Sequence, residues 1–101
     1  MVVRTWRGVT RAGDADAYAA YIEETGLRAL AGTPGNEGVQ LWRRTEGDRA
    51  EFVVASWWES REAIVAFAGE DIERAVFYPE DDRFLVERGE TVAHHDVVRK
   101  A

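Results

Sequence analysis

The nine residues FVVASWWES at positions 52–60 decide the fold, because they place two adjacent tryptophans at the end of a strand-like run. Successive side chains of a β-strand point to opposite faces of the sheet. Trp57 and Trp58 therefore lie on opposite faces, and a sheet with a large ring on each face needs both faces covered. A chain of 101 residues can cover one face with its own helices. The other face then requires a partner subunit or a ligand.

The same run leads directly into a helix pattern. Ser60 is a good N-cap, and Gly69 stands where a C-cap glycine is expected. Ala63, Ile64 and Phe67 recur on one face between them. This helix is predicted to bury Phe67 in the core.

Before the tryptophans, the pattern predicts a strand, a helix and a second strand. The first strand covers residues 3–11, with Arg4, Trp6, Gly8 and Thr10 on one face. The helix begins at the N-cap candidate Asp14, carries apolar residues at helical spacing, and is ended or kinked by the glycine at position 26. Residues 37–45 and 51–58 flank a short turn and are predicted to form a β-hairpin.

The last third of the chain is less regular. Residues 71–77 are compatible with a short helix that Pro79 stops, and residues 81–85 with another helical turn. Residues 91–98 form the last predicted strand.

The order β-α-β-β-α-β predicts an α+β, ferredoxin-like split sandwich. Right-handed crossovers place both helices on one face of a four-stranded antiparallel sheet, which leaves the other face bare. That face carries apolar residues, so two copies are expected to pack sheet against sheet as a homodimer. The space between the sheets, or between sheet and helices, is the candidate ligand cavity.

Composition narrows the possible partners. The length fits one domain, residues 1–101. The net charge of −6 and the scattered basic residues argue against nucleic acid. No apolar run approaches the roughly 20 residues that span a bilayer, and residues 1–5 carry no signal-peptide pattern. The chain has no cysteine, and we expect a cytoplasmic protein.

The order of elements and several motifs together resemble the antibiotic biosynthesis monooxygenase domain. They are the pattern Trp-Trp-x-Ser-x-x-Ala-x-x-x-Phe-x-Gly at residues 57–69, Tyr78 with the following Asp81-Asp82, and Val92-Ala93-His94-His95. The resemblance covers about residues 3–98 and implies a dimeric α+β barrel. It also implies cofactor-independent oxidation of polycyclic phenols or quinols, or haem degradation, since the family contains both.

The haem branch of the family is disfavoured by this sequence. Its members use a histidine from the second-helix region and an asparagine on the first strand. Residues 60–79 contain no histidine and residues 3–11 no asparagine, although a tryptophan near the end of the third strand is in place. Haem iron needs an axial ligand of a suitable type.

Cofactor-free oxygenation needs a base, a stabiliser of developing negative charge, and a dry aromatic pocket. His94 or His95 is the candidate base, Arg4 or Arg43 the candidate stabiliser, and Tyr78 a candidate donor. The candidate substrate-binding residues are Trp6, Trp57, Trp58, Phe67 and His95.

Structural roles account for many of these residues as well. His94 shares a strand face with Asp96, which could orient its imidazole, whereas His95 shares a face with apolar neighbours that suggest burial. The two tryptophans are good core and interface anchors. Residues 80–82 are acidic and are interpreted as solvated or paired with Arg83, since their spacing is not that of a calcium loop. No metal site is predicted.

The leading hypothesis is a homodimeric monooxygenase without metal or organic cofactor, acting on a planar phenol or quinol. The alternative is a non-catalytic homodimer of the same fold, either one that binds a small ligand in the same cavity or a structural one.

Overall fold

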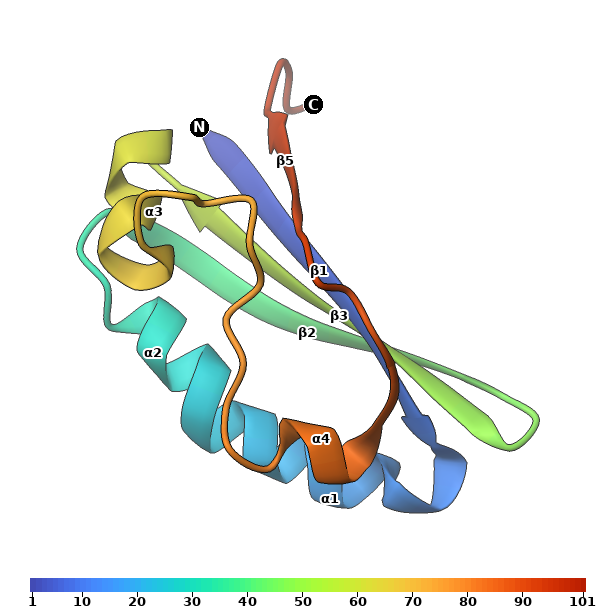
Figure 1. Ribbon diagram of the computed structural model, residues 1–101. Coiled ribbons are helices and arrows are strands. Elements are labelled where there is room, and N and C mark those ends of the chain that lie inside the picture. The colour runs from blue at the N-terminus through green and yellow to red at the C-terminus, as the bar shows by residue number, and fades with distance from the viewer.

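The computed structural model describes residues 1–101 as one layer of helices packed on one antiparallel sheet (Figure 1). The elements, in chain order, are β1 (Val2–Arg11), η1 (Ala12–Asp14), α1 (Ala15–Ile22), η2 (Glu23–Leu27), α2 (Arg28–Ala31), β2 (Asn36–Glu46), β3 (Arg49–Trp58), α3 (Arg61–Ala68), α4 (Asp81–Phe84), β4 (Leu85–Arg88) and β5 (Ala93–Asp96). No helix is long and apolar enough to cross a membrane. The predicted α+β class, with helices on one face of the sheet, is confirmed.

The sheet has the order β2-β3-β1-β4, and β5 also pairs with β1. β2 and β3 form the predicted hairpin, with Gly47 at a positive φ of 61° in its turn. The final strand differs from expectation because it is divided: β4 pairs with Gly8–Thr10 and β5 with Val2–Thr5. Between them, Val92 donates its N–H to the Glu73 carbonyl at 2.8 Å instead of to β1. The sheet therefore has five strands rather than four.

The first helix continues past Gly26, so of the two predicted outcomes, an end or a kink, the end is wrong. Residues 23–27 form one π-helical turn, η2, which joins α1 to α2. Within this region the Thr25 hydroxyl donates to the Tyr21 carbonyl at 2.9 Å. Such π-turns insert an extra residue into a helix and often occur at functional sites. Here the turn brings Gly26 to the side of Tyr78, whose ring lies 3.6 Å from where a Cβ on Gly26 would stand.

The third helix follows the sequence prediction closely. The Ser60 hydroxyl accepts a hydrogen bond from the Ala63 N–H at 3.2 Å, which caps α3. Gly69 ends the helix at a φ of 84°, a conformation that glycine adopts without steric cost.

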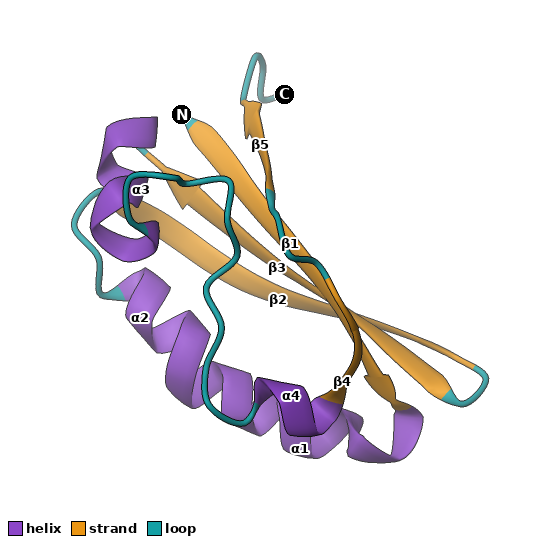
Figure 2. Ribbon diagram, viewed as in Figure 1, coloured by secondary structure: helices purple, strands orange, loops and turns teal.

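The prediction of a short helix at residues 71–77 is wrong. Residues 69–80, here called the connector, form an irregular segment between α3 and α4 that crosses the helix side of the sheet (Figure 2). Its backbone bonds to residues far along the chain: Ala75 donates to the Glu90 carbonyl at 3.0 Å, and Arg74 bridges to Thr91. These long-range partners satisfy the backbone groups that a local helix would have satisfied.

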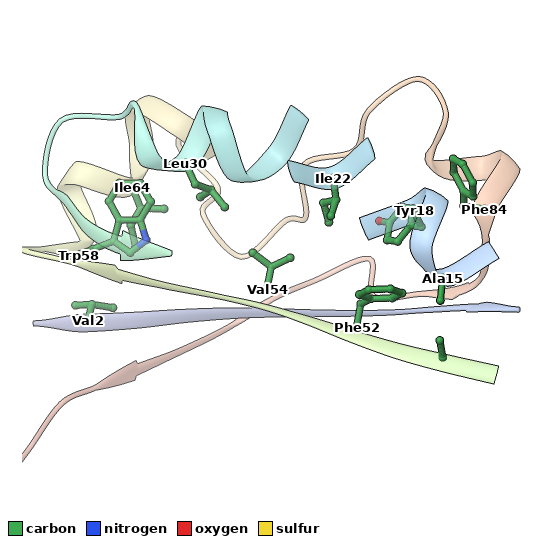
Figure 3. Packing of buried hydrophobic residues seen from close by; sticks show 11 residues of the cluster. Val2, Ala15, Tyr18, Ile22, Leu30, Phe52, Val54, Trp58, Ile64 and Phe84 are labelled. Atoms are coloured by element: carbon green, nitrogen blue, oxygen red, sulfur yellow. The ribbon is translucent and has the colours of Figure 1, made fainter. Parts of the chain in front are cut away.

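The core lies between the sheet and the helices (Figure 3). Trp58 is fully buried there and donates its indole N–H to the Ser56 hydroxyl at 2.8 Å. Trp57, one residue earlier, points to the helix-free face of the sheet and is only partly buried. The predicted division of the two indoles between opposite faces is confirmed.

Replacing Trp58 with alanine is expected to lower the free energy of unfolding by about 3–5 kcal/mol, because it leaves a large cavity in the core. Urea denaturation followed by circular dichroism measures this. Val98→Ala, at a side chain that is 87% exposed, serves as the control and should change stability by less than about 0.5 kcal/mol. Equal losses of unfolding free energy in the two variants would contradict the burial of Trp58 in the core.

Candidate functional site

One cavity lies between the helix-side face of the sheet, the long first helix and the connector, with a volume of about 50 Å³. Most of its wall is apolar and includes Trp6, Ile22, Leu30, Val54, Phe67, Val76 and Val92. The polar side chains that reach it are Arg4, Tyr18, Ser56, Tyr78 and Asp81. The volume admits a few water molecules or a dioxygen molecule, but it is well below the roughly 300–1,000 Å³ typical for drug-sized ligands.

Arg4 is the most unusual group in this wall, because it is a buried cation without a carboxylate partner. Only 4% of the residue is exposed, and no ion pair involves it. Its guanidinium donates to the carbonyls of Ile72 and Arg74, and it stands over the ring of Phe67 at 5.7 Å. Burial lowers the pKa of Arg4 to about 10, so the group remains cationic at neutral pH.

His94 lies on β5, opposite Arg4 on β1, and holds the guanidinium rather than lining the cavity. The distance between Arg4 Nη1 and His94 Nε2 is 3.1 Å. A guanidinium can only donate, so His94 Nε2 accepts and the neutral ring carries its proton on Nδ1. Burial, and next the Arg4 cation, lower the pKa of His94. The expected partner Asp96 instead pairs with Arg61 at 2.8 Å.

Three further predicted site residues, Trp6, Phe67 and Tyr78, line the cavity. The Trp6 indole donates to the Gly89 carbonyl at 2.8 Å, which fixes the ring across the divided edge of the sheet. Burial, and next the negative charge of Asp81, raise the pKa of Tyr78. Its hydroxyl therefore stays protonated at neutral pH and can donate a hydrogen bond.

Asp81 is a cavity residue that the sequence interpretation missed. It was expected to be solvated or paired with Arg83, but it is only 5% exposed, and Arg83 pairs with Glu80 at 2.7 Å. One Asp81 oxygen accepts the Tyr78 N–H at 2.6 Å and the other the Tyr18 hydroxyl at 3.3 Å. Burial raises the pKa of Asp81, although these two hydrogen bonds oppose that rise. The only sequence signal was its position three residues after Tyr78.

The remaining predicted residues do not line the cavity. Trp58 is in the core, while Trp57 and His95 share the helix-free face of the sheet. His95 is exposed in the single chain, so the burial suggested by its apolar neighbours is wrong for this form. Arg43, the other candidate stabiliser, forms a surface ion pair with Asp16 at 2.8 Å.

The arrangement brings two unlike charges into one apolar cavity without pairing them with each other. Arg4 can stabilise negative charge on a ligand oxygen, and Asp81 can accept a proton or a hydrogen bond. No group of three His, Asp or Glu side chains is placed to hold a metal ion.

The chain is similar to a known protein family and to several solved structures. A family model described as antibiotic biosynthesis monooxygenase matches residues 1–76, whereas no curated protein matches the chain. The haem degrader MhuD from Mycobacterium tuberculosis, solved with two haems in its active site, is 25% identical, with a TM-score of 0.56 over 100% of this chain and 99% of that one.

Two less identical structures show the fold alone. Both are classed as antibiotic biosynthesis monooxygenases. The one from Bacillus cereus has a TM-score of 0.68 and 14% identity over 99% of this chain and 97% of that one. The one from Nitrosomonas europaea has a TM-score of 0.67 and 13% identity over 98% of this chain and 100% of that one.

The environment of His94 predicts a pH dependence of stability. Its pKa is lowered in the folded chain, so the unfolded chain binds more protons as the pH falls below the ordinary value of 6.5. Stability should therefore decrease between pH 7 and pH 5, and His94→Gln should remove part of that decrease. Urea denaturation across this range measures it, with His95→Gln as the control. If the stability of the wild type and of His94→Gln changed with pH in the same way, the lowered pKa of His94 would be contradicted.

Proposed function

Because this chain belongs to the antibiotic biosynthesis monooxygenase family, we propose that it oxidises a planar phenol or quinol with molecular oxygen, without a metal or organic cofactor. The observation that carries the proposal is the buried guanidinium of Arg4, which faces an apolar cavity and has no carboxylate partner. A buried cation in such a place complements a ligand that carries or develops negative charge.

Oxidation of a phenol by dioxygen needs a cation beside an apolar cavity. Removing the phenolic proton gives an electron-rich phenolate, which can pass an electron to dioxygen. In the oxidation of a methylene carbon next to the aromatic system, one oxygen atom replaces two hydrogens to form a carbonyl, and the second oxygen atom leaves as water. Negative charge develops first on the phenolate and then on reduced oxygen, and Arg4 is positioned to stabilise it.

The other cavity residues take supporting roles. Trp6 and Phe67 supply flat apolar walls for a ring, and the Tyr78 hydroxyl supplies a hydrogen-bond donor. His94, which we expected as a candidate base, acts in this proposal by orienting Arg4, since its Nε2 already accepts from the guanidinium.

Substrate entry requires the connector to move, because about 50 Å³ cannot hold a phenolic ring system. The connector is attached here by a small set of hydrogen bonds. The Arg4 guanidinium donates to the carbonyls of Ile72 and Arg74. The backbone pairs with residues 90–92, where Val92 donates to Glu73, Ala75 donates to Glu90 and Arg74 bridges to Thr91. Each backbone hydrogen bond contributes a net of about 0.5–1.5 kcal/mol, and each bond from the charged guanidinium about 1.5–3 kcal/mol. Binding energy from a large aromatic ligand can offset their loss.

Haem is the ligand of the 25%-identical MhuD, but the residues here do not fit it well. The cavity wall contains no histidine that could serve as an axial ligand. The macrocycle is also far larger than the cavity. A non-catalytic protein that binds a smaller aromatic ligand in the same cavity is the alternative.

Self-association is part of the proposal. The helix-free face carries Trp57 with Val3 and Val53, and near them Trp42, which is 47% exposed. Farther along the same face, Arg7 and Glu51 form an ion pair with a 2.5 Å separation. A second copy of the chain can cover this face with its own apolar and charged regions.

Replacing Arg4 with methionine is expected to lower kcat by about 10²–10³-fold, because the developing negative charge loses its cation. Oxygen uptake by metal-stripped protein with a panel of hydroquinones and anthrones measures this. Arg43→Met, which removes an exposed arginine, is the matched control and should retain activity. Equal uptake by the two variants would exclude the role of Arg4, and tight binding without any uptake by the wild type would favour the non-catalytic alternative.

Replacing Trp57 with serine is expected to weaken self-association, since each subunit loses roughly 1.5–3 kcal/mol of apolar burial. Sedimentation velocity over a dilution series measures the dissociation constant. Val65→Ser, at a side chain on α3 that is 39% exposed, is the control for surface hydrophobicity. A wild-type protein that stays a single chain at every concentration would rule out this use of the face.

A further inference from the structure

We propose that the Asp81 carboxylate is the base that removes the phenolic proton in the cavity, with Tyr18 as the residue that tunes it. This inference rests on the proposed oxidation and deepens it, because it assigns the proton-transfer step to a residue outside the histidine pair. In that step the phenolic O–H bond breaks, an O–H bond forms on Asp81, and the electron pair stays on the phenolate oxygen.

The first support is the burial of an unpaired carboxylate. Asp81 is 5% exposed, lines the cavity and forms no ion pair. The cation that acts on it from β4, Arg88, is itself paired with Asp82 and Glu90. A carboxylate in this position gains a proton more readily than one in water, since its charged form is poorly solvated.

The second support is free hydrogen-bonding capacity. A carboxylate offers about four acceptor positions, and Asp81 uses one for the Tyr78 N–H and one for the Tyr18 hydroxyl. The Tyr18 bond, at 3.3 Å, is longer than the usual 2.7–2.8 Å for hydroxyl donors and is therefore weak. A phenolic hydroxyl in the cavity can thus find an acceptor on Asp81.

The third support is the charge balance of the whole cavity. Without a ligand, Arg4 is a buried cation with no anion, and Asp81 is a buried anion with no paired cation. Proton transfer from a phenol makes Asp81 neutral and creates a phenolate that Arg4 can pair with. One step therefore neutralises Asp81 and gives Arg4 an anionic partner, whereas transfer to His94 would place a second cation next to Arg4.

The decisive variant is Asp81→Asn, which keeps the size of the side chain but cannot accept the proton. We expect its kcat for phenol oxidation to fall by about 10²–10⁴-fold, the usual contribution of a general base. Asp82→Asn is the matched control, because Asp82 is the next residue, is exposed and pairs with Arg88 at the surface. Similar rates in the two variants would overturn the proposal.

A pH profile separates a base from a merely structural residue. The charged and titratable groups around Asp81 are Tyr18 from α1, Tyr78 from the connector, Arg88 from β4 and the adjacent Asp82. The Tyr18 hydrogen bond lowers the pKa of Asp81, so Tyr18→Phe should raise it. The acidic limb of the kcat/KM profile should then move to higher pH. An unchanged limb in Tyr18→Phe would contradict the proposal.

An anaerobic measurement tests proton transfer to Asp81 separately from the oxidation. 4-Nitrophenol is added below its own pKa, and phenolate absorbance and proton release to the buffer are recorded together. The wild type and Asp82→Asn should form phenolate without releasing a proton, whereas Asp81→Asn should bind neutral phenol. Phenolate formation in Asp81→Asn, stoichiometric proton release by the wild type, or no binding would overturn the assignment. Phenolate formation in this measurement, together with no oxygen uptake in the aerobic panel of hydroquinones and anthrones, would instead reject the oxidation alone.

Discussion

The buried guanidinium of Arg4 is the interaction on which the cavity depends. It joins three segments that are distant in sequence: β1, which carries it, the connector, whose Ile72 and Arg74 carbonyls accept from it, and β5, whose His94 also accepts. The connector therefore crosses the sheet at this point and forms the roof of the cavity. A neutral side chain at position 4 would leave these acceptors without their donor, at a cost typical of buried polar groups.

Much of the fold could be predicted because its signals are local. The alternation of side chains along residues 51–58 placed the two indoles on opposite faces, and Ser60 and Gly69 marked both ends of α3. The connector could not be predicted this way. Its alternation of apolar and charged residues suits a helix, but its backbone groups bond to residues 90–92, and such long-range partners leave no local pattern.

The candidate site also depends on long-range contacts that leave no local pattern in the sequence. Four of the residues predicted from sequence line the cavity, because each lies on a face or in a segment whose position the fold defines: Arg4, Trp6, Phe67 and Tyr78. Sequence reasoning missed Asp81, because an acidic residue between two others is normally solvated. In the fold it lies beside Tyr18, whose hydroxyl donates to it from a helix 63 positions earlier in the chain.

Two unpaired charges in one small cavity are unfavourable for the empty protein, and this constrains what the cavity is for. A domain selected for stability alone would pair Arg4 with a carboxylate or replace it with an apolar residue. Keeping the two charges apart is instead useful when a ligand neutralises both, because binding then gains free energy that the empty fold does not have. The same relief can offset the connector bonds that entry breaks. Family membership fixes the scaffold, whereas in our proposal this charge arrangement favours a neutral phenol that becomes an anion once bound.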